Sequence, residues 1–182
     1  DDSACNVNGD RPAPMVTDGA KDTNNYCDFG ADGRDEGAYF ELDLGAISKV
    51  KGINLWRYFG DGRTYENTVV AIAKDKADFK NGTATIIYNS DANNVQGLGA
   101  GTDAPYAESA AGKSWEFDMT DARYVRVYMH GTTSGGKTNH IVELEVIGAK
   151  VPTSTTTPEE SDLNALIEAL TKVEELDTSL YT

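Results

Sequence analysis

The stretch Tyr39-Phe40-Glu41-Leu42-Asp43-Leu44-Gly45 decides the fold. Phe40, Leu42 and Leu44 alternate with the two acidic residues between them, and this period of two is typical of a strand with one buried and one solvated face. The sequence therefore predicts a half-buried β-strand at this position.

Similar short apolar runs follow along the chain, separated by Gly, Asp or Asn. They lie at residues 50–58, 68–73, 84–89, 114–117, 124–129 and 141–147. Strands at this spacing, with no helical pattern between them, indicate an antiparallel sandwich or barrel. We therefore expect an all-β domain over residues 1–150, in which residues 1–38 carry almost no periodic apolar pattern.

The character of the sequence changes after Gly148. Residues 151–160 are rich in Thr and Pro, which predicts an extended linker. In residues 161–182, Ser161 can cap a helix with one apolar stripe, formed by Leu163, Leu166, Ile167, Leu170, Val173 and Leu176. This stripe needs a partner, so we expect a partial helical segment of a following module.

The chain is acidic, with a formal charge of −14. Such a surface repels phosphate backbones and anionic lipid heads, which argues against nucleic-acid and membrane partners. It is compatible with neutral glycans and bound divalent cations. We expect a monomer that is tethered to other modules of a parent protein.

The two cysteines, Cys5 and Cys27, both lie near the start. In an extracellular protein they predict one disulfide, and the alternative is two unrelated thiols in a cytosolic protein. Catalytic motifs are not found: the two histidines form no serine-protease or zinc-protease pattern, and the acidic pairs near residues 28–36 lie in a region that reads as a solvated loop. We expect a protein that is not an enzyme.

Four segments in order resemble a known superfamily: residues 39–45, 50–55, 122–127 and 143–148. They are similar to the coagulation factor 5/8 type C, or discoidin, superfamily, and most similar to family 32 carbohydrate-binding modules (CBM32) of bacterial glycoside hydrolases. The resemblance covers roughly residues 10–150 and implies a galactose-binding-like jelly-roll sandwich. The C-terminal tail more weakly resembles the start of a FIVAR-type helical module of surface enzymes.

The resemblance also implies a structural calcium (Ca2+) site. Residues 15–23 match the family's Asp-Gly-x-x-x-Thr loop, and the implied ligands are Asp18, Thr23, the carbonyls of Met15, Ala20 and Val142, and the carboxylate of Glu143. Ca2+ prefers six to eight oxygens of this mixed kind. The alternative is a plain Asp-Gly turn with a solvated glutamate.

One loop, residues 56–67, carries the groups that sugar recognition needs. An aromatic face packs against a pyranose ring, and planar donors bind its hydroxyls. The candidates for ligand binding are Tyr26, Trp56, Arg57, Tyr58, Arg63, Asn67, His130, Asn139 and His140. Trp56 or Tyr58 could instead pack in the core, and Arg57 could pair with an acidic residue on a sheet face.

These observations lead to one main hypothesis and one alternative. The first is a non-catalytic carbohydrate-binding module of a secreted or cell-wall-attached glycoside hydrolase, which binds a host or plant glycan. The alternative is a discoidin-type adhesion module that binds a protein or a lipid head group.

Overall fold

The computed structural model of the chain describes residues 10–31, 38–133, 138–150 and 167–169. Its strands are β1 (Cys27–Ala31), β2 (Ala38–Arg57), β3 (Val69–Ala73), β4 (Thr85–Asn89), β5 (Lys113–Met129) and β6 (Thr138–Lys150). A 3-10 helix, η1 (Ala13–Thr17), precedes them, and the single-turn helix α1 (Asp78–Asn81) follows β3. The all-β prediction is confirmed.

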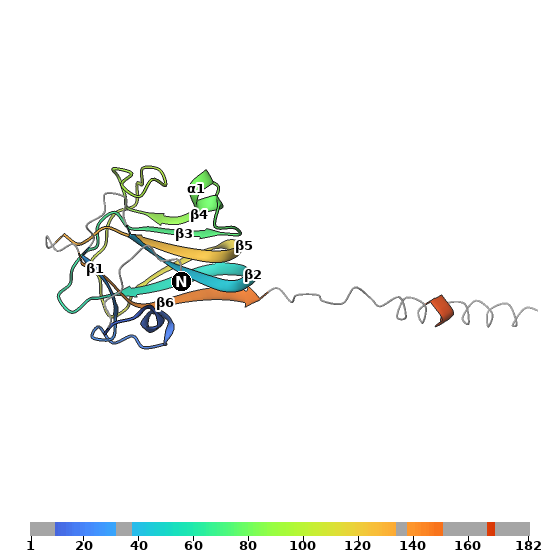
Figure 1. Ribbon diagram of the computed structural model, residues 1–182, viewed down its shortest axis with the longest axis horizontal. Coiled ribbons are helices and arrows are strands. Elements are labelled where there is room, and N and C mark those ends of the chain that lie inside the picture. The colour runs from blue at the N-terminus through green and yellow to red at the C-terminus, as the bar shows by residue number, and fades with distance from the viewer. Residues whose placement is uncertain (1–9, 32–37, 134–137, 151–166, 170–182) are drawn as a thin grey trace, which may run out of the picture. The chain divides into compact units, whose positions relative to one another are not determined.

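The strands are hydrogen-bonded in the order β1-β6-β2-β5-β3-β4, and all pairings are antiparallel. The long strands β2 and β5 run through the middle of the sandwich, with β6 on one side and β3 and β4 on the other (Figure 1). The second half of β2 pairs with β6, whereas the second half of β5 pairs with β3. Each long strand therefore contributes to both layers, as expected for a jelly roll.

The core lies between the layers and takes side chains from every strand. Alternation in β2 directs Phe40, Val50, Ile53 and Leu55 inward, and β5 adds Val125 and Val127. All six are nearly inaccessible to solvent. Burial of such side chains contributes about 1.5–3 kcal/mol each and stabilises the scaffold that carries the loops.

The structure joins strands that the sequence pattern separates. The runs at 39–45 and 50–58 are parts of one strand, β2, which bends where Gly45 has a φ of +80° and the register with β5 shifts. The runs at 114–117 and 124–129 likewise belong to β5. Residues 1–38 carry almost no periodic apolar pattern, yet β1 lies within them and pairs with β6.

By its internal contacts the chain divides into two units, Asp1–Val151 and Pro152–Thr182. In the second unit, residues 167–169 are helical, and the rest of the predicted linker and apolar stripe lies outside the described residues. Cys27 is buried at the start of β1, whereas Cys5 lies outside the described residues, so their disulfide stays a prediction. Among the residues described, no helix has the length and apolar character to cross a bilayer.

Candidate functional site

Three strand ends meet at one end of the sandwich, on the left in Figure 1. In the sheet, Arg57 at the end of β2 lies opposite Ile141 near the start of β6. On the other side of β6, Asp28 of β1 lies opposite His140. This register brings the loop after β2 together with the start of β6 and the residue before β1.

Four of the predicted ligand-binding residues contact one another here: Tyr26, Tyr58, Arg63 and His140, which we call the rim cluster. The Tyr26 and Tyr58 rings lie 5.4 Å apart at an angle of 82°. The His140 ring lies 4.4 Å from Tyr26 and 5.8 Å from Tyr58. These residues come from three separate segments, and both tyrosines are only half-buried, so the cluster offers aromatic surface to a ligand.

Arg63 completes the rim cluster with a planar cation. Its guanidinium carbon lies 4.4 Å from the centre of the Tyr58 ring, a cation–π distance. Asp61 holds the same guanidinium with two hydrogen bonds, from Nε (2.8 Å) and from Nη2 (2.7 Å). These bonds lower the pKa of Asp61 and raise that of Arg63. The bidentate pair fixes the orientation of the arginine before any ligand arrives.

The protonation state of His140 follows from its neighbours. Burial lowers its pKa to about 4, and the nearby Asp28 opposes this shift only in part. Arg63 Nη1 lies 3.4 Å from His140 Nδ1, and Asp28 Oδ1 lies 3.5 Å from Nε2. Nδ1 therefore faces a donor and Nε2 an acceptor. The geometry selects a neutral ring with its proton on Nε2.

The structure adds two residues to the site that the sequence analysis missed. The Arg11 guanidinium lies 3.9 Å from the Tyr26 ring centre, on the side of the cluster formed by the N-terminal segment. Asp28 lies beside His140. Neither residue lies in a motif: the pairing of β1 with β6 places Asp28 beside His140, and the N–H of Asp28 donates to the carbonyl of Arg11.

Burial removes three predicted ligand contacts from the surface: Trp56, Arg57 and Asn139. Trp56 is 7% exposed and its indole N–H donates to the carbonyl of Ala110. Asn139 is fully buried, and its Oδ1 accepts from the N–H of Gly131. Arg57 is 1% exposed. These side chains contact other parts of the fold, and a ligand-binding role stays a prediction for all three.

The remaining two candidates lie at the ends of neighbouring elements. Asn67 has a φ of 47°, a left-handed conformation that asparagine tolerates, and its carbonyl accepts from Gln96 Nε2 at 2.9 Å. His130 directly follows β5 and is half-buried. A ligand-binding role stays a prediction for both.

The predicted calcium loop lies against β6 as expected. The N–H of Gly19 donates to Oε2 of Glu143 at 2.9 Å, which joins the first loop to the last strand. Glu143 is 3% exposed, and burial, with Asp18 nearby, raises its pKa. Thr23 Oγ1 accepts from the N–H of Phe59, so the same loop also supports the loop of the rim cluster.

The residues of this loop fit a hard cation. The Asp18 and Glu143 carboxylates lie close enough to repel one another, Glu143 is buried, and the positive charge of Lys21 offsets this cost only in part. Among the described residues there is no group of three or more His, Cys, Asp or Glu side chains suited to a metal. A site here would therefore depend on carbonyl and hydroxyl oxygens, which Ca2+ accepts readily.

The comparison with solved structures identifies the architecture. The CBM32 of AlyQ, in complex with 4,5-unsaturated mannuronic acid, has a TM-score of 0.57 at 22% identity, over 81% of this chain and 92% of that one. The family 32 module of Clostridium perfringens NanJ, in complex with galactose, has a TM-score of 0.53 at 20% identity, over 79% and 89%. The chain has the fold of family 32 carbohydrate-binding modules.

The CBM32 fold also occurs within larger matched proteins. The family 89 glycoside hydrolase from Clostridium perfringens, in complex with PUGNAc, has a TM-score of 0.58 at 17% identity, over 87% of this chain but only 15% of that one. No protein-family model and no curated protein sequence matches the chain. The predicted jelly-roll architecture is thus confirmed by structure, at identities that establish the CBM32 fold alone.

Proposed function

We propose that the chain is a non-catalytic carbohydrate-binding module that holds the end of a neutral glycan at the rim cluster. The observation that carries this proposal is the convergence of Tyr26, Tyr58, Arg63 and His140 at the loop end of a CBM32 fold. The two tyrosine rings, almost perpendicular, form a corner for the apolar face of a pyranose. The guanidinium and the imidazole supply directed hydrogen bonds to its hydroxyls.

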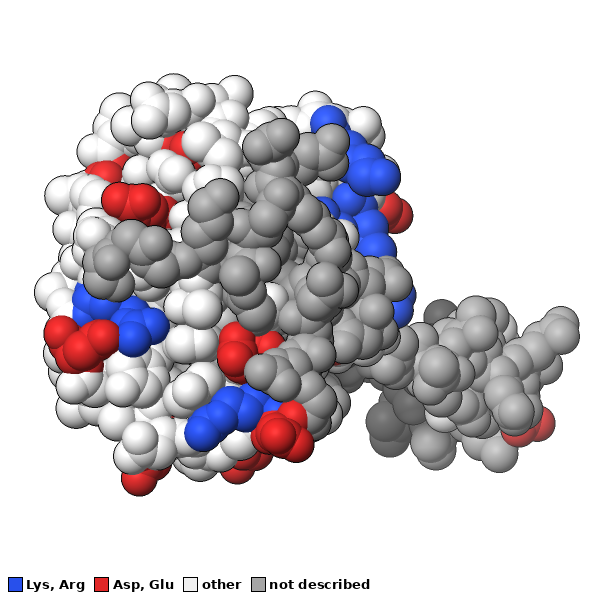
Figure 2. All heavy atoms as spheres, turned by 60° about the vertical axis from the view of Figure 1, so that its left-hand side comes forward, with Lys and Arg blue, Asp and Glu red and all other residues white. Residues whose placement is uncertain are grey.

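The charges around the rim cluster favour a neutral sugar over a uronic acid. Arg63 already pairs with Asp61, and the Asp28 carboxylate lies beside His140. His140 is neutral above its pKa of about 4. Figure 2 shows, on the left half of this face, basic groups beside acidic groups with uncharged surface between them. The Arg63 guanidinium, which faces Tyr58 and His140, would therefore meet a ligand carboxylate with its charge already matched by Asp61.

Matched sugar pairs test this proposal. Calorimetric titrations would compare galactose with galacturonate, mannose with mannuronate and glucose with glucuronate. In at least one pair the neutral sugar should bind, and its uronate should bind about tenfold more weakly, a difference of roughly 1.4 kcal/mol. Tighter binding of a uronate would contradict the neutral-glycan proposal, and no binding of any neutral sugar would count against a sugar site.

A parent enzyme is the natural context for such a module. The AlyQ match includes a form with both CBM32 and alginate lyase domains, and the Clostridium perfringens match is a glycoside hydrolase. We propose that this chain likewise belongs to a secreted bacterial enzyme and keeps that enzyme near its glycan. Weak single-site binding suffices for this task, because tethering raises the effective concentration.

We also propose that Ca2+ binds between the 15–23 loop and β6. Asp18 and Glu143 would supply carboxylate oxygens, Thr23 its hydroxyl, and Met15, Ala20 and Val142 their carbonyls. The bound ion would offset the burial and the nearby Asp18 charge, which together raise the pKa of Glu143. It would stabilise the junction that supports the rim cluster through Thr23 and Phe59.

Chelation should therefore lower the melting temperature of the protein. An ion present at about 100 times its dissociation constant contributes about 2.7 kcal/mol, which corresponds to roughly 6–10 °C for a domain of this size. Differential scanning calorimetry with Ca2+ and with EDTA measures the change. Glu143→Gln should melt early and no longer respond to EDTA, whereas the exposed Glu116→Gln should respond like the wild type. An unchanged melting temperature on chelation would contradict the calcium site.

A further inference from the structure

A buried polar cluster lies behind the loop that carries Arg63. It consists of Arg57, Tyr65, Tyr106 and Glu108, which we call the inner cluster. Arg57 is 1% exposed, Tyr65 3% and Glu108 5%. The Arg57 guanidinium stacks on the Tyr65 ring with 3.5 Å between its carbon and the ring centre, and its Nη1 donates to Thr68 Oγ1 at 2.6 Å.

Five buried polar atoms of the inner cluster make no well-aligned hydrogen bond within the protein. They are Nε and Nη2 of Arg57, the hydroxyl oxygens of Tyr65 and Tyr106, and Oε2 of Glu108. An unpaired buried donor or acceptor costs about 1–3 kcal/mol, and native proteins almost always satisfy such groups with protein or ordered water. Five of them in one cluster therefore indicate a site for buried water.

The unpaired atoms lie within electrostatic range of one another. Arg57 and Glu108 both shift the pKa of Tyr65 and of Tyr106, and the Tyr106 hydroxyl lies close enough to the Glu108 carboxylate to lower the pKa of Glu108. The groups also complement each other, because a cation and two hydroxyl donors surround a single carboxylate. A buried water molecule typically makes about three hydrogen bonds, which this arrangement of donors and acceptors can supply.

The inner cluster is joined to the rim cluster through the backbone. The N–H of Glu108 donates to the carbonyl of Arg63 at 2.9 Å. The next residues, Thr64 and Ala107, form an isolated antiparallel bridge. Glu108 therefore holds the backbone of Arg63 while its side chain lies in the inner cluster.

We propose that Glu108 is a positioning residue of the glycan site, acting through water molecules held among Glu108, Arg57, Tyr65 and Tyr106 to fix the loop that carries Arg63. The ionised carboxylate is the effective form, since it accepts hydrogen bonds through water from Arg57 and from both hydroxyls. Loss of this charge leaves the buried Arg57 guanidinium without a counter-charge, directly before the loop that runs from Tyr58 to Arg63. The functional consequence rests on the proposed glycan site, whereas the placement of Arg63 does not.

Glu108 is the group of the inner cluster whose charge changes near neutral pH, so its effect on Arg63 should depend on pH. Burial raises the pKa of Glu108 to about 7, with Arg57 and Tyr106 opposing the shift. Four groups face the Glu108 carboxylate: Arg57 on β2, Tyr65 two residues after Arg63, Tyr88 on β4, and Tyr106 two residues before Glu108. The pKa of each of these tyrosines is raised above its usual value near 10, so none of them titrates near neutral pH.

The first measurement needs no sugar. The Arg63 Nε–H group donates to Asp61 and should give a resolved signal in 15N NMR spectra, assigned with Arg63→Lys. Between pH 5.5 and 8.5 this signal should shift in the wild type with a midpoint near the Glu108 pKa of about 7. Glu108→Gln should abolish the shift, Tyr65→Phe should reduce it, and Glu116→Gln, the same change on an exposed glutamate, should leave it intact.

The second measurement uses methyl β-galactoside and, if that sugar does not bind, the tightest neutral sugar from the matched pairs. Affinity in the wild type should fall about fivefold as the pH drops from 8 to 5.5, and Glu108→Gln should bind about fivefold more weakly at pH 8 with no such pH dependence. If neutral sugars bind but the Arg63 Nε–H signal shifts neither with pH nor in Glu108→Gln, the positioning role of Glu108 is overturned. If the signal responds but no sugar binds, the glycan site is overturned and the placement of Arg63 by Glu108 stands.

Discussion

Replacing Arg63 with alanine should reduce glycan affinity at least about 30-fold while leaving the fold intact. Arg63 supplies the planar donors of the rim cluster and covers the Tyr58 ring, and its loss removes both contacts at once. Its ion pair with Asp61 is formed with a largely exposed acid, so the melting temperature should change little. Isothermal titration calorimetry and thermal unfolding separate the two effects.

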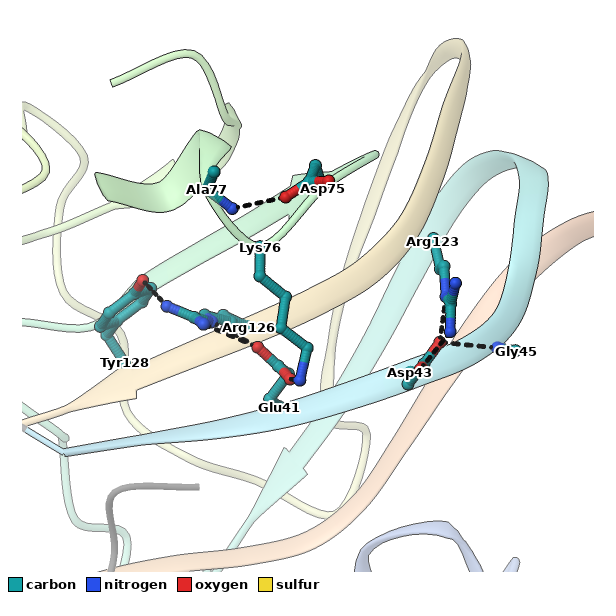
Figure 3. A network of polar contacts seen from close by, with 9 residues as sticks. All are labelled: Glu41, Asp43, Gly45, Asp75, Lys76, Ala77, Arg123, Arg126 and Tyr128. Carbon is teal, nitrogen blue, oxygen red and sulfur yellow. Dashed lines mark hydrogen bonds and ion pairs between the residues drawn. The ribbon is translucent and has the colours of Figure 1, made fainter. Parts of the chain in front are cut away.

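The chain offers a matched control for this substitution. Arg123 makes the same kind of bidentate pair, with its Nε 2.8 Å and Nη2 2.9 Å from the two oxygens of Asp43 (Figure 3). Arg123→Ala removes the same charge and the same ion pair from β5, outside the rim cluster. It should leave glycan binding unchanged. An equal loss of glycan affinity in Arg63→Ala and Arg123→Ala would show that overall charge, not the rim cluster, governs binding.

Replacing Glu41 with alanine should destabilise the fold by about 3–5 kcal/mol. Its side chain is 3% exposed and lies 2.7 Å from Arg126 Nη2, whose own side chain is 7% exposed. Lys76 Nζ lies 2.8 Å from the other oxygen, and Figure 3 shows the three side chains converging. The substitution would leave the Arg126 charge buried without its carboxylate, which is the costly way to break a buried pair.

Asp43→Ala is the control for this effect. Asp43 lies two residues further along β2 and pairs with Arg123, but its side chain is 40% exposed. Water screens this pair, so its loss should cost less than about 1 kcal/mol. Urea denaturation measures both changes. A cost for Glu41→Ala no larger than that for Asp43→Ala would contradict the assigned importance of the buried pair.

The surroundings of Arg126 explain why a double variant should behave differently. Its guanidinium carbon lies 4.1 Å from the Tyr39 ring centre and 4.2 Å from that of Phe79, so apolar surface encloses it. Replacing both Glu41 and Arg126 with methionine keeps the volume and removes both charges. We expect this double variant to be more stable than Glu41→Ala alone, because no unpaired charge remains.

The strand pattern of this protein could be predicted because each buried strand carries a strong local signal. Phe40, Leu42 and Leu44 alternate with acids, and the structure directs the apolar side chains into or toward the core. The sequence does not reveal β1, because Cys27–Ala31 is short and depends on β6 for its hydrogen bonds. β1 forms because it pairs with β6, which is distant in the sequence, and no local sequence pattern predicts such a strand.

The candidate site could be predicted in part, because residues 56–67 form a loop that is unusually rich in aromatic and arginine side chains. Tyr58 and Arg63 do come together there, with Tyr26 and His140 brought in by strand pairing. Composition could not separate Arg57, which is enclosed by Tyr65 and Thr68, from Arg63 six residues later. Which arginine is buried depends on how residues 106–108 pack against this loop.

A glycan array probed with the purified chain in Ca2+ tests the central claim most directly. The wild type and Arg123→Ala should bind the same set of neutral glycans, and a variant with both Tyr58→Ala and Arg63→Ala should bind none of them while it melts at nearly the same temperature. Absence of any glycan signal for the wild type, or an unchanged signal for the double variant, would contradict the assignment of the rim cluster as a carbohydrate site.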